Sequence, residues 1–265
     1  MARLSFRKYE GLGNDFLLID AESEALVTPD QAVALCDRRL GVGADGVLLL
    51  LPSHDRANAR RMKVSNADGS TPEMCGNGIR CVALDLARAR GDERTELRIE
   101  TDAGIHACAV DVPLGRVTVD MGPARVLGDR TLELAQGHFV LTVASVGNPH
   151  AVLFGEYARE DVERLGPAVE VHPAFPRRTN VEFARFDGGV VDLVVWERGV
   201  GVTLACGTGA CATAAVLCAK GRAAHDRPIE VRLPGGILSV TIESTTEHAI
   251  LSGPARHVFD GVVVT

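Results

Sequence analysis

The sequence lacks any long apolar run and any excess of positive charge. No segment approaches the roughly 18 consecutive apolar residues that a membrane-spanning helix requires. The opening stretch MARLSFRKYEGLGNDF contains no apolar signal-peptide core. The formal net charge is −7, from 28 Lys and Arg against 35 Asp and Glu, so no basic surface for nucleic acid or anionic membrane is indicated. These absences predict a cytoplasmic protein that binds neither nucleic acid nor membrane.

The composition is that of a soluble globular protein, with 46% hydrophobic and 24% charged residues. A chain of 265 residues without low-complexity segments is long enough for two domains of ordinary size. The seven cysteines are an odd number, and in a cytosolic chain we expect reduced thiols rather than disulfides.

Runs rich in β-branched residues predict a mixed α/β chain dominated by strands. The expected strands are 16–20, 46–51, 97–101, 106–112, 116–121, 139–146, 190–197, 229–233 and 237–243. Helical spacing predicts helices over 29–39, 77–90, 159–165 and 208–220. Thr28 suits the N-cap of the first, while Gly91 and Gly221 suit the ends of the second and fourth.

Each half of the chain has the same order of strands, a Cys-Gly-polar-Gly motif, a helix buried all round, and further strands. This weak internal repeat predicts two domains with a boundary near Gly122-Pro123. The expected domains are 1–121 and 122–253, with an apolar tail, 254–265, that returns to the first.

The two repeated motifs are CGNG at 75–78 and CGTG at 206–209. The first N–H groups of a helix have no partner inside it, and the helix dipole adds partial positive charge there. A carboxylate could therefore bind the backbone of Gly76, Asn77 and Gly78, and equally that of Gly207, Thr208 and Gly209. We expect the same field to lower the pKa of the cysteine that precedes each helix.

Two such motifs facing one another would place a sulfur on each side of one carbon. Cys75 or Cys206 as thiolate would remove a proton from one face, and the other as thiol would protonate the opposite face. This chemistry inverts a stereocentre, and it requires neither a metal nor a cofactor.

Other interpretations of the cysteines remain open. Cys36, Cys81, Cys108, Cys211 and Cys218 are expected to be small core residues. A zinc site would use four cysteines in two pairs, although the spacings Cys-x5-Cys and Cys-x4-Cys differ from the usual close pair. A phosphate-binding loop is a further alternative, but neither motif continues into Gly-Lys-Ser/Thr.

Polar residues near turns are further candidates for the site. Asn14, Asn66, Asn148 and Asn180 lie in loop contexts, where asparagine commonly stabilises turns. Glu197 and Arg198 are either a solvated pair at a strand end or, for the arginine, a bidentate carboxylate clamp. His150 is either a turn residue or a proton partner for a thiolate.

Five blocks in order, KYEGLGNDFLLID, NADGSTPEMCGNGIRC, GNPH, RTNVEFA and WERGVGVTLACGTGACA, resemble the diaminopimelate epimerase family, as does the tail GPARHVFDG. The resemblance implies two pseudo-symmetric domains, each a curled mixed sheet around a central helix, with the active site in the cleft between them. It also implies interconversion of LL- and meso-diaminopimelate without pyridoxal phosphate, in lysine and peptidoglycan synthesis. A small-molecule substrate and a homodimer are expected.

The resemblance also assigns roles to residues. Cys75 and Cys206 align with the catalytic bases, and His150 and Glu197 with residues beside the two sulfurs. The reacting carboxylate would be bound by Gly76, Asn77, Gly207 and Thr208. The distal end of the substrate would be bound by Asn14, Asn66, Asn148, Asn180 and Arg198.

The chain departs from the family pattern at two positions. Gly46 stands where some members have Gln, and Val202 stands where Glu is common. A racemase for proline, hydroxyproline or histidine is therefore an alternative with the same chemistry. A zinc-binding or ligand-binding module without catalytic activity is an alternative from another class.

Overall fold

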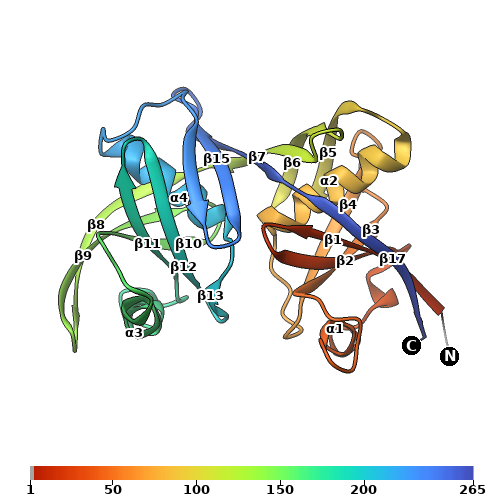
Figure 1. Cartoon of the computed structure of the whole chain (residues 1–265), viewed down its shortest axis with the longest axis horizontal. Coiled ribbons are helices and arrows are strands. Elements are labelled where there is room, and N and C mark those ends of the chain that lie inside the picture. The colour runs from red at the N-terminus through yellow and green to blue at the C-terminus, as the bar shows by residue number, and fades with distance from the viewer. Residues whose placement is uncertain (1–2, 265) are drawn as a thin grey trace. The chain divides into compact units, whose positions relative to one another are not determined.

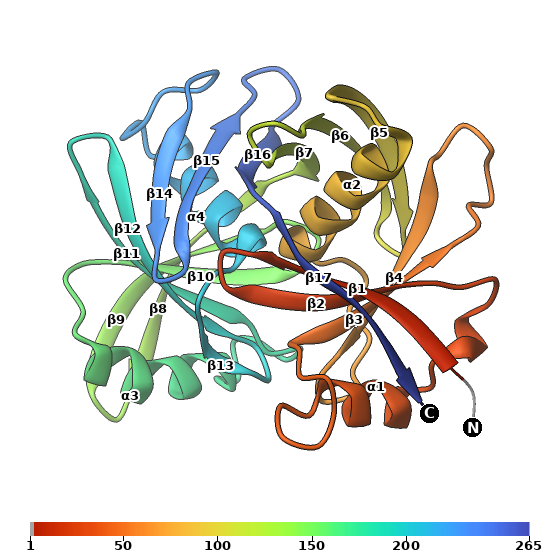
Figure 2. The ribbon, with the colours of Figure 1, turned by 45° about the vertical axis from the view of Figure 1, so that its right-hand side comes forward.

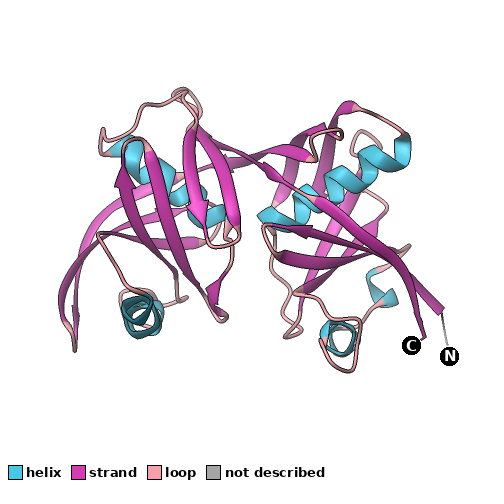
Figure 3. Ribbon diagram, in the orientation of Figure 1, coloured by secondary structure: helices cyan, strands magenta, loops and turns pink. Residues whose placement is uncertain are grey.

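The structure, a computed structural model, describes residues 3–264 as two compact units. Unit 1 comprises Met1–Val119 and Gly253–Thr265, and unit 2 comprises Asp120–Ser252. The chain passes from unit 1 to unit 2 within β7 and returns within β16. In both units strands greatly outnumber helices (Figures 1 and 3), and the predicted α/β class is confirmed.

Unit 1 is a mixed sheet in the order β17-β1-β2-β3-β4-β5-β6-β7, parallel at β2–β3 and β4–β5 and otherwise antiparallel. Its elements are β1 (Arg3–Gly11), β2 (Asn14–Asp20), a 3-10 helix (Glu24–Leu26), α1 (Pro29–Cys36), β3 (Gly46–Leu51), β4 (Arg60–Asn66), α2 (Gly76–Arg90), β5 (Arg94–Thr101), β6 (Gly104–Asp111), β7 (Arg116–Pro123) and β17 (Arg256–Val264).

Unit 2 has the order β8-β9-β10-β11-β12-β14-β15-β16, with the short β13 also paired to β12. Its elements are β8 (Arg125–Leu134), β9 (Gly137–Ser145), β10 (Pro149–Phe154), α3 (Arg159–Glu170), β11 (Asn180–Asp187), β12 (Val190–Glu197), β13 (Gly201–Thr203), α4 (Gly207–Ala219), β14 (Ile229–Leu233), β15 (Gly236–Ile242) and β16 (His248–Pro254).

The two units repeat one topology. Parallel pairing at β10–β11 and β12–β14 in unit 2 matches β2–β3 and β4–β5 in unit 1, and the strands around them match in turn. Each sheet curls around one central helix, α2 or α4, which contacts strands on several sides (Figure 2). The strands around one central helix therefore have equivalents around the other.

The central helices are those predicted from the cysteine motifs, with bounds within one residue of expectation. α2 ends where Gly91 adopts φ +76°, a conformation that glycine enters without strain. α4 has the apolar composition of a helix buried on all sides, and nearly all its residues are buried. Burial fixes both helices firmly, so their N-termini are rigid platforms for side chains.

The remaining helices pack on the outer faces of the sheets. α1 begins with the predicted Thr28 cap, completed as a capping box by Gln31, but it ends at Cys36 rather than at residue 39. α3 packs closely on β12, because a Cβ at Gly166 would lie 2.6 Å from the Trp196 ring. None of the helices described between residues 3 and 264 is long and apolar enough to cross a membrane.

Candidate active site

Cys75 is the N-cap of α2. Its backbone is extended, with φ −136° and ψ 113°, so its side chain turns back over the first helical turn. The Gly78 N–H donates to its Sγ at 3.4 Å, and the thiol is partly exposed. The motif thus places a sulfur directly at the positive end of a buried helix.

Cys206 is the N-cap of α4 and has nearly the same geometry. Its φ and ψ are −126° and 108°, and the Gly209 N–H donates to its Sγ at 3.4 Å. The Thr208 hydroxyl also contacts this sulfur, at a distance of 3.5 Å. Unlike Cys75, Cys206 is buried, with 6% of its surface exposed.

The pKa of Cys206 is shifted in the direction opposite to the one predicted from the helix field. Burial raises this pKa well above its usual value, and the charges of Glu197 and Glu182 raise it further. The hydrogen bonds from Thr208 and Gly209 lower it, but they are the smaller effects. The expectation of a lowered pKa is therefore wrong for Cys206, because the surroundings of its sulfur favour the thiol.

Glu197 lies beside Cys206, as the resemblance implied for one of the two sulfurs. It ends β12, and its Oε1 accepts a 2.6 Å hydrogen bond from the Thr203 hydroxyl. Burial raises the pKa of Glu197, and hydrogen bonds with Thr203 and Cys206 offset part of that shift. Thr203 is the last residue of β13, so its hydrogen bond lets this short strand position the Glu197 carboxyl group.

His150 is fully buried on β10 and lies in the same group. Its Nδ1 is 2.6 Å from Glu182 Oε1, and its Nε2 is 2.8 Å from Asn148 Oδ1. Asn148 Nδ2 in turn donates to Thr208 Oγ1 at 3.3 Å. Unit 2 therefore gathers four predicted residues, Cys206, Thr208, Asn148 and His150, into one hydrogen-bonded network.

Glu182 was not among the predicted site residues. It lies in β11 with no exposed surface, inside the quoted block RTNVEFA. The available signal was an acidic residue within an otherwise apolar strand segment, since a buried charge is normally paired. Only the tertiary structure reveals that its partner is His150, on the neighbouring strand β10.

In unit 1 the predicted asparagines lie close to the start of α2. Asn77 Nδ2 donates to Asn14 Oδ1 at 3.2 Å, and Asn14 Nδ2 donates to Asp45 Oδ2 at 2.8 Å. The buried Arg80 holds the other end of the Asn77 amide, with its Nη2 donating to Oδ1 at 2.9 Å. Asn66 ends β4 separately, and its Nδ2 donates to Ser70 Oγ at 2.9 Å.

Asn180 and Arg198 form a pair through backbone contacts. Asn180 Oδ1 accepts from the Arg198 N–H at 2.9 Å, and its Nδ2 donates to the carbonyl of Pro149 at 3.1 Å. The buried Asn180 amide thus fixes the turn that carries Arg198. The Arg198 side chain is exposed, and its Nη1 donates to the Arg177 carbonyl at 3.2 Å.

The departure at Gly46 has a steric reason. A Cβ built there would lie 2.9 Å from the Ser65 carbonyl oxygen and 3.5 Å from the Phe16 ring. The local backbone therefore leaves no room for a glutamine side chain at this position without adjustment.

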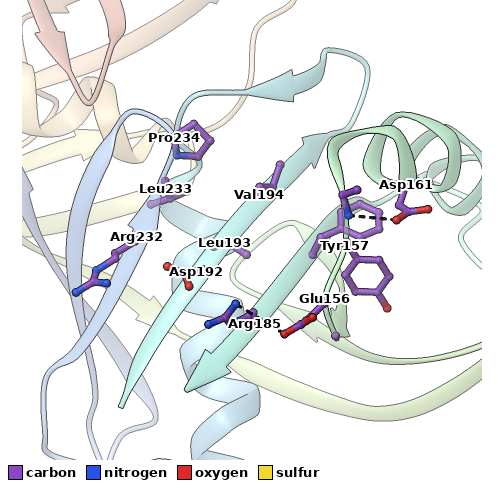
Figure 4. A pocket seen from close by; sticks show the side chains of 13 residues that line it. Glu156, Tyr157, Asp161, Arg185, Asp192, Leu193, Val194, Arg232, Leu233 and Pro234 are labelled. Atoms are coloured by element: carbon purple, nitrogen blue, oxygen red, sulfur yellow. Dashed lines mark hydrogen bonds and ion pairs between the residues drawn. The ribbon is translucent and has the colours of Figure 1, made fainter. Parts of the chain in front are cut away.

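A separate cavity of about 690 Å³ lies in unit 2 (Figure 4). Its lining includes Arg185, Arg232, Tyr157 and Asp192. Successive side chains of a strand point to opposite faces, so Phe183 and Arg185 face this cavity while Glu182 faces α4. The cavity contains none of the predicted site residues.

Within residues 3–264, no group of three or more His, Cys, Asp or Glu side chains is arranged to hold a metal ion.

Solved structures define the class of fold. A hydroxyproline epimerase from Agrobacterium vitis, with bound trans-4-hydroxy-L-proline, matches with a TM-score of 0.75 at 20% identity over 98% of this chain and 92% of that one. A predicted epimerase from Pseudomonas aeruginosa matches with a TM-score of 0.77 at 18% identity over 99% of both chains. At these identities the likeness shows a shared fold, that of a group of structures that includes epimerases.

Sequence comparisons are more specific. The family model described as Diaminopimelate epimerase matches residues 6–127 and 142–258. A diaminopimelate epimerase from Synechococcus sp. (strain JA-3-3Ab) is 45% identical over 285 residues, covering 98% of both chains. Another, from Desulforudis audaxviator (strain MP104C), is 46% identical over 278 residues, covering 97% of this chain and 98% of its own. The chain therefore belongs to the diaminopimelate epimerase family.

Proposed function

We propose that this protein interconverts LL- and meso-2,6-diaminopimelate, the reaction that serves lysine and peptidoglycan synthesis. The observation that carries this proposal is the repeated helix start, in which a cysteine caps a buried helix and receives an amide N–H at 3.4 Å. Membership of the family supplies the substrate.

Cys75 and Cys206 are the proposed acid and base. The proposal requires each cysteine to reach one of the two faces of the same α-carbon. One thiolate takes the α-proton as the C–H bond breaks, and the other thiol gives its proton to the opposite face as a new C–H bond forms. The two sulfurs exchange protonation states, so the proton count is conserved and no cofactor is required.

The helix starts also stabilise the charge that develops. Removing the α-proton places negative charge on the substrate carboxylate, and backbone amides at a helix N-terminus are donors already oriented toward it. The proposed carboxylate ligands are Gly76, Asn77, Gly207 and Thr208. In both units the buried helix holds these amides fixed, so little reorganisation is needed during the reaction.

We assign the distal amino acid end of the substrate to the asparagines and Arg198. His150 and Glu197 are assigned as supporting groups for the thiols, and for Cys206 the short contacts in unit 2 favour this role. Asn14, Asn66, Asn148 and Asn180 lie near turns that present amide groups, while Arg198 has an exposed guanidinium. A second carboxylate and ammonium on the substrate would use these groups, whereas proline or hydroxyproline would not.

Incubation with LL-diaminopimelate in deuterium oxide tests the proposal. We expect meso product that carries deuterium at the inverted α-carbon only, with no added metal or pyridoxal phosphate. The measurement is chiral chromatography with mass spectrometry of the product. Product that keeps its original hydrogen in single-turnover conditions would contradict a two-base route, and turnover of proline in place of diaminopimelate would support the alternative racemase.

We further propose that the enzyme is a homodimer formed at β17. This strand pairs antiparallel with β1. It also exposes apolar side chains, with Val258, Phe259, Val262 and Val264 each 44–57% exposed. Several exposed apolar side chains on one strand favour association with a second copy.

Sedimentation velocity tests the dimer. We expect a species of twice 28.1 kDa that shifts to the monomer mass when Val262 is replaced by lysine. A monomer in the unmodified protein at micromolar concentration would contradict the proposal.

We place the enzyme in the cytoplasm, because two catalytic thiols require a reducing compartment.

A further inference from the structure

The strand β11 places a buried acidic residue, Glu182, near Cys206, and the mechanism above does not use it. Glu182 and His150 have no exposed surface, and their side chains meet at 2.6 Å. Glu182 Oε2 is also buried, and no described residue between 3 and 264 donates to it. A buried carboxyl with one unsatisfied oxygen contributes little to folding stability, which suggests a role in function.

The hydrogen bonds that start at Glu182 all run toward the sulfur. Asn148 donates from Nδ2 to Thr208 Oγ1, so its Oδ1 faces His150, and His150 Nε2 must carry a hydrogen. The other ring nitrogen, Nδ1, forms a hydrogen bond with Glu182 Oε1. Thr208 accepts from Asn148 and can direct its own hydrogen to Cys206 Sγ at 3.5 Å.

The carboxyl of Glu182 lies directly against the first turn of α4. A Cβ at Gly209 would be 2.9 Å from Glu182 Oε1 and 3.3 Å from Cys206 Sγ. Glycine at this position therefore lets the carboxyl approach the positive end of the helix, close to the sulfur.

Unit 1 has no such acid at the equivalent place. Phe16 pairs with the first residue of β3 as His150 pairs with the first residue of β11, so Leu48 is the equivalent of Glu182. The packing agrees, because a Cβ at Gly78 would lie 3.1 Å from a Leu48 methyl group. The two cysteines thus cap similar helix starts, but the residue packed against the helix start is the apolar Leu48 in unit 1 and the acidic Glu182 in unit 2.

We propose that Glu182 is a positioning residue for Cys206, which acts through His150, Asn148 and Thr208 to direct a hydrogen-bond donor at the sulfur. Glu182 fixes the proton on the far ring nitrogen of His150, and each following group is oriented in turn. The donor stabilises the Cys206 thiolate that forms when this sulfur gives its proton to the substrate carbon. Its catalytic consequence rests on the proposed function, whereas its effect on the thiol does not.

The groups that face Cys206 act in opposite directions. Glu197 from β12 and Glu182 from β11 oppose the thiolate by charge, and burial does the same. The Gly209 amide and the Thr208 hydroxyl favour it, and His150 from β10 supports the latter. A buried thiol that must be deprotonated in each cycle therefore depends on its few donors.

Two variants of equal charge isolate the hydrogen-bond anchor. Glu182→Gln keeps a donor for His150 Nδ1, so the far nitrogen keeps its hydrogen, while Glu182→Leu has the apolar shape found at Leu48 in unit 1. Loss of the donor to the sulfur would raise the Cys206 pKa in Glu182→Leu by about one unit relative to Glu182→Gln. The measurement is the pH dependence of iodoacetamide labelling of the Cys206 peptide, read by mass spectrometry. Glu230→Gln on β14 is the control and should leave the profile unchanged.

Kinetics and a double variant complete the test. We expect kcat for diaminopimelate to be about ten- to a hundredfold lower in Glu182→Leu than in Glu182→Gln, with KM nearly equal. In a Thr208→Val background, the Gln and Leu variants at position 182 should give nearly the same labelling profile, because the hydrogen-bond chain is already broken. Identical labelling profiles for the Gln and Leu variants would overturn the proposal. If the Leu variant does not fold, the labelling profiles of Thr208→Val and Thr208→Ser are compared instead. Identical profiles for these two variants would also overturn the proposal, because only serine keeps the hydroxyl donor. Absence of epimerisation with a shifted labelling profile would instead refute the proposed function alone.

Discussion

Replacing either Cys75 or Cys206 by serine should lower kcat for LL-diaminopimelate by about a thousandfold or more. A serine hydroxyl keeps the shape of the side chain and the amide contact. Its much higher pKa prevents it from serving as a base at neutral pH, and as an acid it is weaker than a thiol. Each direction of the reaction needs one sulfur in each role, so losing either one blocks both directions. The measurement is the rate of meso product formation by chiral chromatography.

Matched controls come from the same two helices. The control variants are Cys81→Ala in α2 and Cys218→Ala in α4. The thiols of Cys81 and Cys218 are both buried, and burial raises the pKa of each. We expect both control variants to keep kcat within a few fold of the parent, because their sulfurs only fill core space. If a serine variant at 75 or 206 retained more than a tenth of the parent rate, the two-base assignment would be wrong.

The double variant adds a further check. Because the two sulfurs act as one unit, removing both should cost little more than removing one. Additive losses in the double variant would indicate two independent contributions, which a two-base mechanism does not allow.

The helices that carry the cysteines could be predicted because their signals are local. Cys-Gly-polar-Gly followed by closely spaced apolar residues and a terminal glycine defines both ends of α2 and α4 within a few residues. The end of α1 was predicted too late, because the Asp37 side chain accepts from the N–H groups of Arg39 and Leu40 and stops the helix in a turn. The signal there is a single side-chain contact that periodicity does not contain.

Several strands were missed for a different reason. β10 begins at Pro149, so GNPH was interpreted as a turn, and β8 is exposed along most of its length and has no apolar alternation. Both strands are formed by pairing with β9, a long-range interaction. Local propensity cannot supply it. The repeat would have indicated β10, because its equivalent in unit 1 is the predicted strand β2.

The pKa of Cys206 could not be predicted from the motif, because the motif describes only the helix. Burial depends on how tightly the sheet closes around α4, and the acidic neighbours come from β11 and β12. The same limit applies to Glu182, whose partner on β10 is distant in the sequence. The sequence therefore predicts which thiols are candidates for the reaction, whereas tertiary packing sets how readily each one loses a proton.

Arg198 should determine the preference for diaminopimelate over lysine. Lysine has the same carbon chain but no distal carboxylate, so it would lack the charge-assisted hydrogen bonds that an arginine forms with a carboxylate. Asn180 fixes the backbone at Arg198. The exposed guanidinium of Arg198 donates from Nη1 to the Arg177 carbonyl at 3.2 Å, and because a guanidinium has five N–H donors, it can also bind a ligand carboxylate. Binding energy at this remote end would help to position the reacting α-carbon.

Arg198→Met should therefore lower kcat/KM for diaminopimelate by about a hundredfold, since a charge-assisted pair contributes roughly that factor. Turnover of lysine, slow in the parent enzyme, should not change, so the ratio of the two specificity constants should fall by the same factor. Arg185→Met is the matched control, because Arg185 is an exposed arginine of unit 2 that lines the separate cavity. An unchanged ratio in Arg198→Met, measured by the same chiral assay, would show that another group binds the distal carboxylate. A loss shared equally by both substrates would show instead that Arg198 maintains the site without contacting the distal end.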